Sequence, residues 1–211
     1  MRDDKTNYTI LPSSSLVLRF RIKRRLIYVA IGAAAFLIAY SVGGAIPLSE
    51  EEAAEVRKQF AEQVEGIDQN GIFLNNFKIS LVMFIPVVGI GFGELAGFGT
   101  GAVFSAIAAA NPALGGIPPI AILITPFGVM EVFIYGLAMS RSGLLVVRLV
   151  KDKPWRAGAG RPFYESQLIP TFIEIGIAAA VLFAAAVIEW QLIELLGGLD
   201  TAVLLEPGPP A

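Results

Sequence analysis

The segment Leu26–Ile46 contains no charged side chain. A helix of that length rises about 30 Å, which matches the hydrocarbon core of a bilayer. Similar apolar segments follow along the chain, so that 55% of the 211 residues are hydrophobic and only 16% are charged. Soluble proteins carry about 25% charged residues. The sequence therefore predicts an all-α membrane protein.

Two residue types that carry much of protein chemistry do not occur, because the chain has no Cys and no His. Disulfides, thiolate nucleophiles, haem or iron–sulfur ligation, Ser-His-Asp catalysis and nearly every zinc or copper site are excluded with them. A net charge of -2 gives no basis for nucleic-acid binding. We expect no catalytic residues, no cofactor, no metal and no nucleic-acid partner.

Five apolar segments predict five transmembrane helices, at residues 26–46, 72–93, 102–110, 119–138 and 167–190. The basic cluster Arg19–Arg25 precedes the first of them. Because this apolar segment exceeds the roughly 7–15 residues typical of a signal peptide, we expect a retained helix. Ser49 followed by Glu52 is a capping-box pattern, which predicts an acidic, solvated helix at 49–66 outside the bilayer.

The distribution of positive charge predicts the orientation. The N-terminal segment 1–25 and a basic loop at 141–165 together hold 13 of the 16 Lys and Arg residues. Cytoplasmic segments are enriched in these residues. We therefore expect the N-terminus inside and the Pro-rich tail 197–211 outside, on either side of a membrane domain at 26–196. A four-span topology, in which 102–110 is re-entrant, is the alternative.

A helix from residue 72 to residue 110 would be roughly twice as long as the membrane is thick, so we expect the chain to turn at Gly97–Gly101. Small residues recur there at every fourth position: Gly89, Gly93, Gly97, Gly101 and Ser105. Small side chains let helix backbones approach closely in lipid. The pattern predicts two short packing faces, which contact each other or the span at 119–138.

Four ionisable residues fall in or near the predicted spans: Glu94, Glu131, Glu174 and Lys78. Charges there are costly and usually face protein or water. The spacing puts Glu131 and Glu174 each about 12 Å from the cytoplasmic boundary. We expect the three carboxyl groups to approach one another in the inner half of the bundle, with Lys78 in the outer half.

Two interpretations of these carboxyl groups are open. They form a proton or cation site, or each one is protonated and bonds a backbone carbonyl that is freed by a Pro or Gly break. The pair Asn75-Asn76 stands at the start of the second predicted span, where it is expected to cap the helix.

The order of several motifs resembles the stage II sporulation protein M family of integral membrane proteins over residues 70–150. Asn75 and Asn76 open the Gly-rich region, and Ser140–Gly143 follows the fourth span. The family's motif is Pro-His-Gly, then any two residues, then Glu; Pro126, Gly128 and Glu131 match it, and Phe127 stands at the His position. The resemblance implies a multi-spanning, non-enzymatic protein, since family members in spore-forming bacteria anchor cell-wall hydrolases in a membrane complex.

The predicted function is a scaffold or accessory subunit of a larger complex in the cell membrane. Its partners would be membrane lipids and either other integral membrane subunits or further copies of the chain. The alternative is a small transporter or conducting component, which would need a polar cavity bordered by Glu94, Glu131 and Glu174. An intramembrane enzyme is disfavoured, because such enzymes usually need His, paired Asp or a metal cluster.

Overall fold

The computed structural model describes residues 14–110, 118–155 and 163–195, and within these ranges the chain is helical with no strand. Four helical segments are long and apolar enough to cross a membrane, so the predicted all-α class is confirmed, whereas five spans are not found. The helices are α1 (Ser14–Ala45), α2 (Glu50–Val64), α3 (Gln69–Met83), α4 (Val88–Ala110), η1 (Pro119–Ile124), α5 (Pro126–Asp152), η2 (Tyr164–Leu168) and α7 (Ile169–Leu195).

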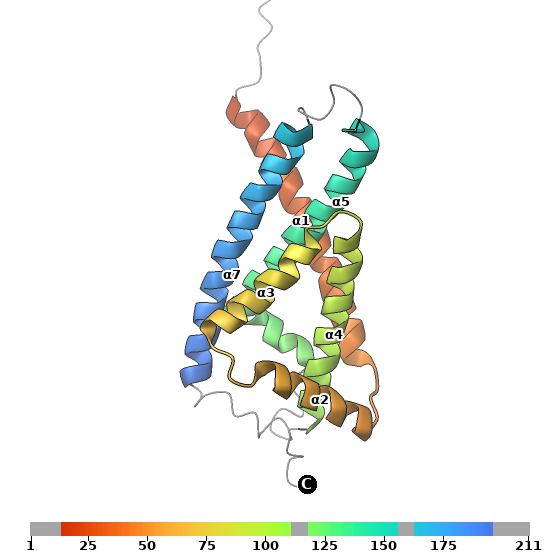
Figure 1. Ribbon diagram of the computed structural model, residues 1–211, viewed down its shortest axis with the longest axis vertical. Helices are drawn as coiled ribbons and strands as arrows, with labels where there is room; N and C mark the ends of the chain where they lie inside the picture. Colours follow the sequence, from red (N-terminus) through yellow and green to blue (C-terminus); the bar gives the residue numbers. More distant parts are fainter. Residues whose placement is uncertain (1–13, 111–117, 156–162, 196–211) are drawn as a thin grey trace, which may run out of the picture.

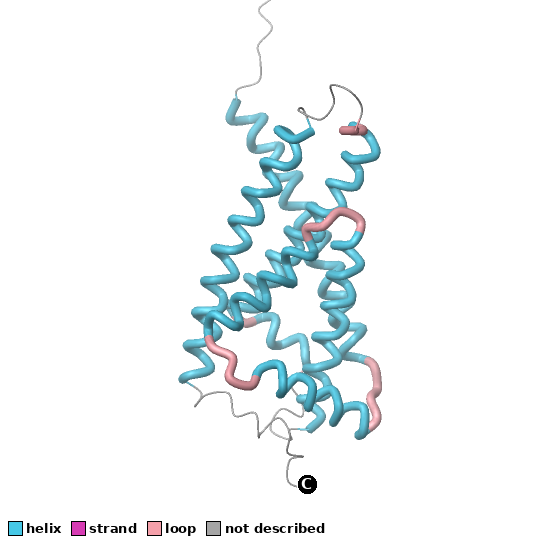
Figure 2. Tube along the Cα trace, viewed as in Figure 1, coloured by secondary structure: helices cyan, strands magenta, loops and turns pink. Residues whose placement is uncertain are grey.

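Three of the long helices, α1, α5 and α7, run along the long axis of the molecule, and α2 lies across one end of it (Figure 1). The pair α3 and α4 lies on the near side in this view, and both helices have their outer ends near α2. The loop between α3 and α4 lies well short of the opposite end (Figure 2). The pair is thus a helical hairpin that extends part of the way along the bundle.

The predicted turn at Gly97–Gly101 is wrong, because α4 is continuous from Val88 to Ala110. The predicted spans 72–93 and 102–110 are therefore replaced by α3 and α4. The chain turns between Met83 and Val88 instead, next to Pro86, which cannot continue a helical hydrogen-bond ladder. Val87 takes a φ of 74°, in the left-handed region that β-branched residues rarely occupy.

Four glycines of the small-residue ladder share one buried face of α4: Gly89, Gly93, Gly97 and Gly101. A Cβ on Gly101 would lie 2.0 Å from the carbonyl oxygen of Tyr40 in α1, and one on Gly93 would lie 2.6 Å from the sulfur of Met139 in α5. The face is thus packed mainly against the first span and partly against α5. Lipid provides no hydrophobic driving force for two helices to associate. Glycines on this face let the helix backbones approach closely, so that van der Waals packing stabilises the contact instead.

The helix α5 begins later and ends later than the predicted span 119–138. Pro126 is its first residue, and Thr125 accepts a hydrogen bond from the backbone N–H of Gly128 at 3.2 Å. Pro is well suited to this position because its missing N–H would be unpaired anyway. Since α5 continues to Asp152, the first half of the predicted basic loop 141–165 is helical.

The acidic segment forms α2, and the predicted capping box between Ser49 and Glu52 is confirmed. One side of α2 is exposed, and the other packs against α4. There Arg57 is buried and donates a 3.2 Å hydrogen bond to the carbonyl of Ala106. The N-terminal residues before Ser14, the loop after Ala110 and the predicted tail 197–211 lie outside the described residues.

Candidate functional site

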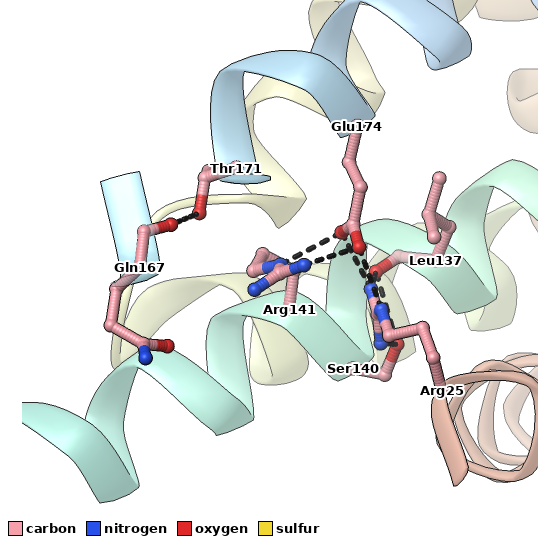
Figure 3. A network of polar contacts seen from close by, with 7 residues as sticks. All are labelled: Arg25, Leu137, Ser140, Arg141, Gln167, Thr171 and Glu174. Carbon is pink, nitrogen blue, oxygen red and sulfur yellow. Dashed lines mark hydrogen bonds and ion pairs between the residues drawn. The ribbon is translucent and has the colours of Figure 1, made fainter. Parts of the chain in front are cut away.

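The largest polar cluster of the described core joins three helices around the carboxylate of Glu174 (Figure 3). Arg25 of α1 donates two hydrogen bonds to it, from Nε and Nη2, both of 2.7 Å. Arg141 of α5 also donates two, one of them a 2.7 Å bond from Nε. One carboxylate is therefore held in bidentate fashion by two guanidinium groups.

The second edge of the Arg25 guanidinium is also satisfied. It donates to the hydroxyl of Ser140 at 2.7 Å and to the carbonyl oxygen of Leu137 at 2.9 Å. The side chain of Arg141 is only 8% exposed, and that of Glu174 only 12%. Planar bidentate contacts of this kind add geometric specificity as well as energy, so the cluster fixes the mutual position of α1, α5 and α7.

The start of α7 presents Glu174 to the two arginines. The turn before it, η2, is a π-helix, in which Ile169 donates its N–H to the carbonyl of Tyr164. Pro170 follows and has no N–H to donate. The next residue, Thr171, donates its hydroxyl to the carbonyl of Gln167, one turn earlier, at 2.7 Å. This bond keeps the buried polar groups at this end of α7 paired.

A second polar cluster lies nearer the start of α5, in contact with α3. Asn76 donates its side-chain amide to Glu131 at 2.5 Å and accepts a hydrogen bond of 3.1 Å from the hydroxyl of Tyr135. Glu189 of α7 lies near Glu131. Asn76 therefore links the hairpin helix α3 to the bundle.

The core between the two clusters is apolar. On α5 it contains Ile134 and Ala138, and on α7 it contains Ala178 and Leu182; each of the four is at most 1% exposed. A conducting path for ions or protons needs polar groups or water along its whole length. Within the described residues, buried apolar side chains thus lie between the two clusters.

The structure does not bring the predicted carboxyl groups together. Glu174 pairs with two arginines, Glu131 pairs with Asn76, and Glu94 is exposed on the outer face of α4. The expected bonds to carbonyls freed by Pro or Gly breaks are likewise not formed by Glu131 or Glu174, which accept hydrogen bonds from side-chain N–H groups.

Lys78 of α3 and Glu94 of α4 are both exposed on the hairpin. Within the described ranges, neither residue has a hydrogen bond or an ion pair with another side chain. Each is the single ionisable residue of its helix. In a helix that crosses lipid, an unpaired charge costs roughly 2.5–3.5 kcal/mol on insertion scales.

The residues that match the family motif lie at the start of α5. Pro126 and Gly128 form the first turn of α5, Phe127 is buried beside them, and Glu131 follows one turn later. A Cβ on Gly128 would lie 2.6 Å from the carbonyl oxygen of Ile122, so a larger residue does not fit. Asn75 and Asn76 lie inside α3, whose N-cap is Asp68, so the expected capping role is wrong.

Two hollows stand out on the described surface, and neither borders a carboxyl group. One is lined by Leu37, Ile38, Ser41, Val42 and Ala45 of α1. The other lies between the end of α1 and the residues Pro118–Ile120. These apolar grooves do not match the polar cavity that the transporter interpretation requires.

Sequence reasoning missed Arg25, Arg141 and Glu189 as members of these clusters. The arginines were assigned to cytoplasmic segments, because they flank the apolar segments. The spacing gave no signal for the pairing, because it predicts Glu131 and Glu174 at one depth, whereas Arg141 lies ten residues, or about 15 Å of helix, beyond Glu131. Comparisons with known protein families, with curated proteins and with solved structures found no match.

Proposed function

We propose that the chain is a non-catalytic scaffold or accessory subunit of a larger complex in the cell membrane. The observation that carries the proposal is the way in which charged groups are sorted between the interior and the surface. The buried carboxylate of Glu174 is fully engaged inside the bundle. Lys78 and Glu94 are left without partners on the outer face of α3 and α4.

This sorting separates structural charges from those that can bind a partner. A buried carboxylate held by two guanidinium groups has no free lone pair directed at a passing ion. Exposed charges on a membrane helix gain most when a protein partner replaces lipid around them. The alternative function, transport through the intramembrane carboxyl groups, has less support because buried apolar side chains lie between the two clusters.

We also infer a topology from the distribution of basic residues. With α1, α5 and α7 crossing the bilayer, the start of α1 and the end of α5 lie on one side, and this side carries the described residues Arg24, Arg148 and Lys151. The positive-inside rule then assigns that side to the cytoplasm. The hairpin of α3 and α4 enters the membrane from the opposite side, together with α2.

The resemblance to the stage II sporulation protein M family supports the same class of function. It rests on the motif that begins at Pro126, and it adds the expectation that the partners are enzymes which act at the cell envelope. The anchoring role is proposed here for the chain, without the sporulation process.

The test is purification from native membranes into lipid nanodiscs, followed by identification of the proteins that copurify in fixed proportion. We expect one or more membrane subunits to copurify. A chain that is recovered alone and monomeric at native abundance contradicts the proposal. In parallel, Glu131→Gln and Glu174→Gln are assayed in reconstituted vesicles; loss of an ion or proton flux that the unmodified chain supports would favour transport instead.

A further inference from the structure

The hairpin formed by α3 and α4 carries one cation and one anion on its exposed face. Lys78 lies five residues before Met83, where α3 ends, and Glu94 lies six residues after Val88, where α4 begins. At 1.5 Å per residue, both side chains start about 8–9 Å from the tip of the hairpin. The two opposite charges therefore start at nearly the same distance along their helices from the tip of the hairpin.

From this juxtaposition we propose that the outer face of the hairpin binds a second copy of the chain, with Lys78 of each copy paired to Glu94 of the other. A two-fold axis along the membrane normal leaves every residue at the same depth in both copies. In such an interface a contact from one residue to another is made twice, once in each direction. Two residues can form a reciprocal pair only if their depths differ by less than their side chains can reach, and their nearly equal distances from the hairpin tip favour this for Lys78 and Glu94.

The surface around the two charges suits close approach of another helix. A Cβ on Gly91 or on Gly99 would meet no atom within 4 Å, so these two glycines of α4 face away from the rest of the chain. The buried glycines at 89, 93, 97 and 101 are already covered by α1 and α5. Leu95, between the open glycines, is 67% exposed. The dimer would bury an open glycine face together with two otherwise unpaired charges.

Charge complementarity selects a second copy over an unrelated partner. The face presents one positive and one negative group, so it is complementary to itself after a half-turn. An unrelated partner would have to supply both charges at the same depth. This inference rests on the proposed scaffold function, and it specifies one of the partners.

The experiment measures the dimer fraction in nanodiscs or in lipid vesicles by single-molecule photobleaching, with the full chain. We expect Lys78→Glu and Glu94→Lys each to raise the dimer dissociation constant at least tenfold, because each substitution places like charges opposite each other twice. The double variant Lys78→Glu/Glu94→Lys should return to within about threefold of the original value. The matched controls are Lys58→Glu and Glu62→Lys on the exposed side of α2. Both should leave the dimer dissociation constant unchanged.

Mixing the two single variants provides a test that misfolding cannot imitate. A Lys78→Glu chain and a Glu94→Lys chain place opposite charges against each other at both contacts, so they should form a mixed dimer, although neither dimerises alone. The absence of native cysteine makes a second readout simple. Gly91→Cys should give a chemically cross-linked dimer, whereas Phe172→Cys on the exposed side of α7 should not.

The outcomes separate this inference from the proposed function. Dimers that are insensitive to both charge reversals, or single variants that fail to pair when mixed, overturn the inference. A monomeric chain that copurifies with other membrane subunits also overturns it and leaves the scaffold function in place. A chain that is monomeric and copurifies with nothing contradicts both.

Discussion

Arg25 and Glu174 lie 149 positions apart in the chain, yet the guanidinium of Arg25 donates two 2.7 Å hydrogen bonds to the carboxylate of Glu174. This pair joins the first span to the last. With Arg141, it makes the packing of three helices depend on a single carboxylate. Interactions between positions so distant in sequence form only when the whole bundle is assembled, so their loss should affect global stability.

The first prediction concerns this carboxylate. Glu174→Ala leaves two guanidinium groups unpaired, and we expect it to lower the free energy of unfolding by about 3 kcal/mol, as for removal of one member of a buried ion pair. Arg25→Ala should cost less, about 1.5 kcal/mol, because Arg141 still holds the carboxylate. The measurement is equilibrium unfolding in mixed micelles, followed by circular dichroism.

A matched arginine on α5 serves as the control. The side chain of Arg148 is 51% exposed, and its Nη1 lies 3.8 Å from Oδ1 of Asp152. Exposed pairs of this kind contribute about 0–1 kcal/mol, so Arg148→Ala should be close to neutral. The double variant Arg25→Ala/Glu174→Ala should be less destabilised than the sum of the two single effects. Strict additivity would show that the two residues do not interact in the membrane.

The second prediction uses the adjacent asparagines of α3. Asn76→Ala leaves Glu131 and the hydroxyl of Tyr135 without their shared partner, and should lower the free energy of unfolding by about 1–3 kcal/mol. Asn75 is exposed, so Asn75→Ala should change the free energy of unfolding by less than about 0.5 kcal/mol. Chemical unfolding of the two variants side by side is the measurement. Equal effects of the two substitutions would contradict the assigned link between α3 and α5.

The third prediction compares two glycines of α4. Gly101→Ala would put a Cβ 2.0 Å from the carbonyl oxygen of Tyr40 and 2.9 Å from the backbone nitrogen of Gly44, so α1 and α4 must separate. We expect a loss of about 1–3 kcal/mol in unfolding free energy, as for overpacking of a core. Gly99→Ala meets no atom within 4 Å, and should be neutral or stabilising by about 0.5–1 kcal/mol.

Thermal unfolding of both variants, by loss of helical circular dichroism, decides between packing and intrinsic helix propensity. Propensity alone would make the two glycine substitutions equivalent. A stabilising Gly101→Ala would mean that α1 and α4 do not pack as closely as the structure has them.

The apolar segments predicted the helical class, because a long segment without charge has few alternatives in lipid. They did not predict where α4 begins. The length of residues 72–110 predicted a turn, which we expected in the glycine-rich segment Gly97–Gly101, but glycines packed on one face are compatible with a continuous membrane helix. The break occurs instead at Pro86, which has no N–H to continue the helical hydrogen-bond ladder.

The site was less predictable than the fold. Hydropathy defines where a helix is apolar, not where it ends, and α5 continues past its apolar part to Asp152. Arg141 thus lies inside a helix although it stands at the edge of the apolar segment. Pairing between α1, α5 and α7 depends on the rotation of each helix about its axis, which one sequence does not specify.

The last prediction concerns pH and the capping box of α2. The backbone N–H of Ser49 donates a 2.9 Å hydrogen bond to the carboxylate of Glu52, and the hydroxyl of Ser49 donates one of 2.8 Å. These bonds lower the pKa of Glu52 below its ordinary value of 4.5, the backbone bond contributing most and slight desolvation opposing. Folding therefore favours the charged form of this carboxyl group.

The sign of the pH dependence follows from that direction. The stabilisation from this group is fully present above pH 4.5, the ordinary value, and is lost as the pH falls through the lowered pKa of the folded state. We expect the protection factors of the amides at the start of α2, which are exchange rates corrected for the intrinsic pH dependence of amide exchange, to fall as the pH drops below about 4. Glu52→Gln should remove most of this pH dependence, whereas Glu51→Gln, at the neighbouring exposed position, should keep it. An unchanged pH response in Glu52→Gln would mean that other carboxyl groups control the acid sensitivity of α2.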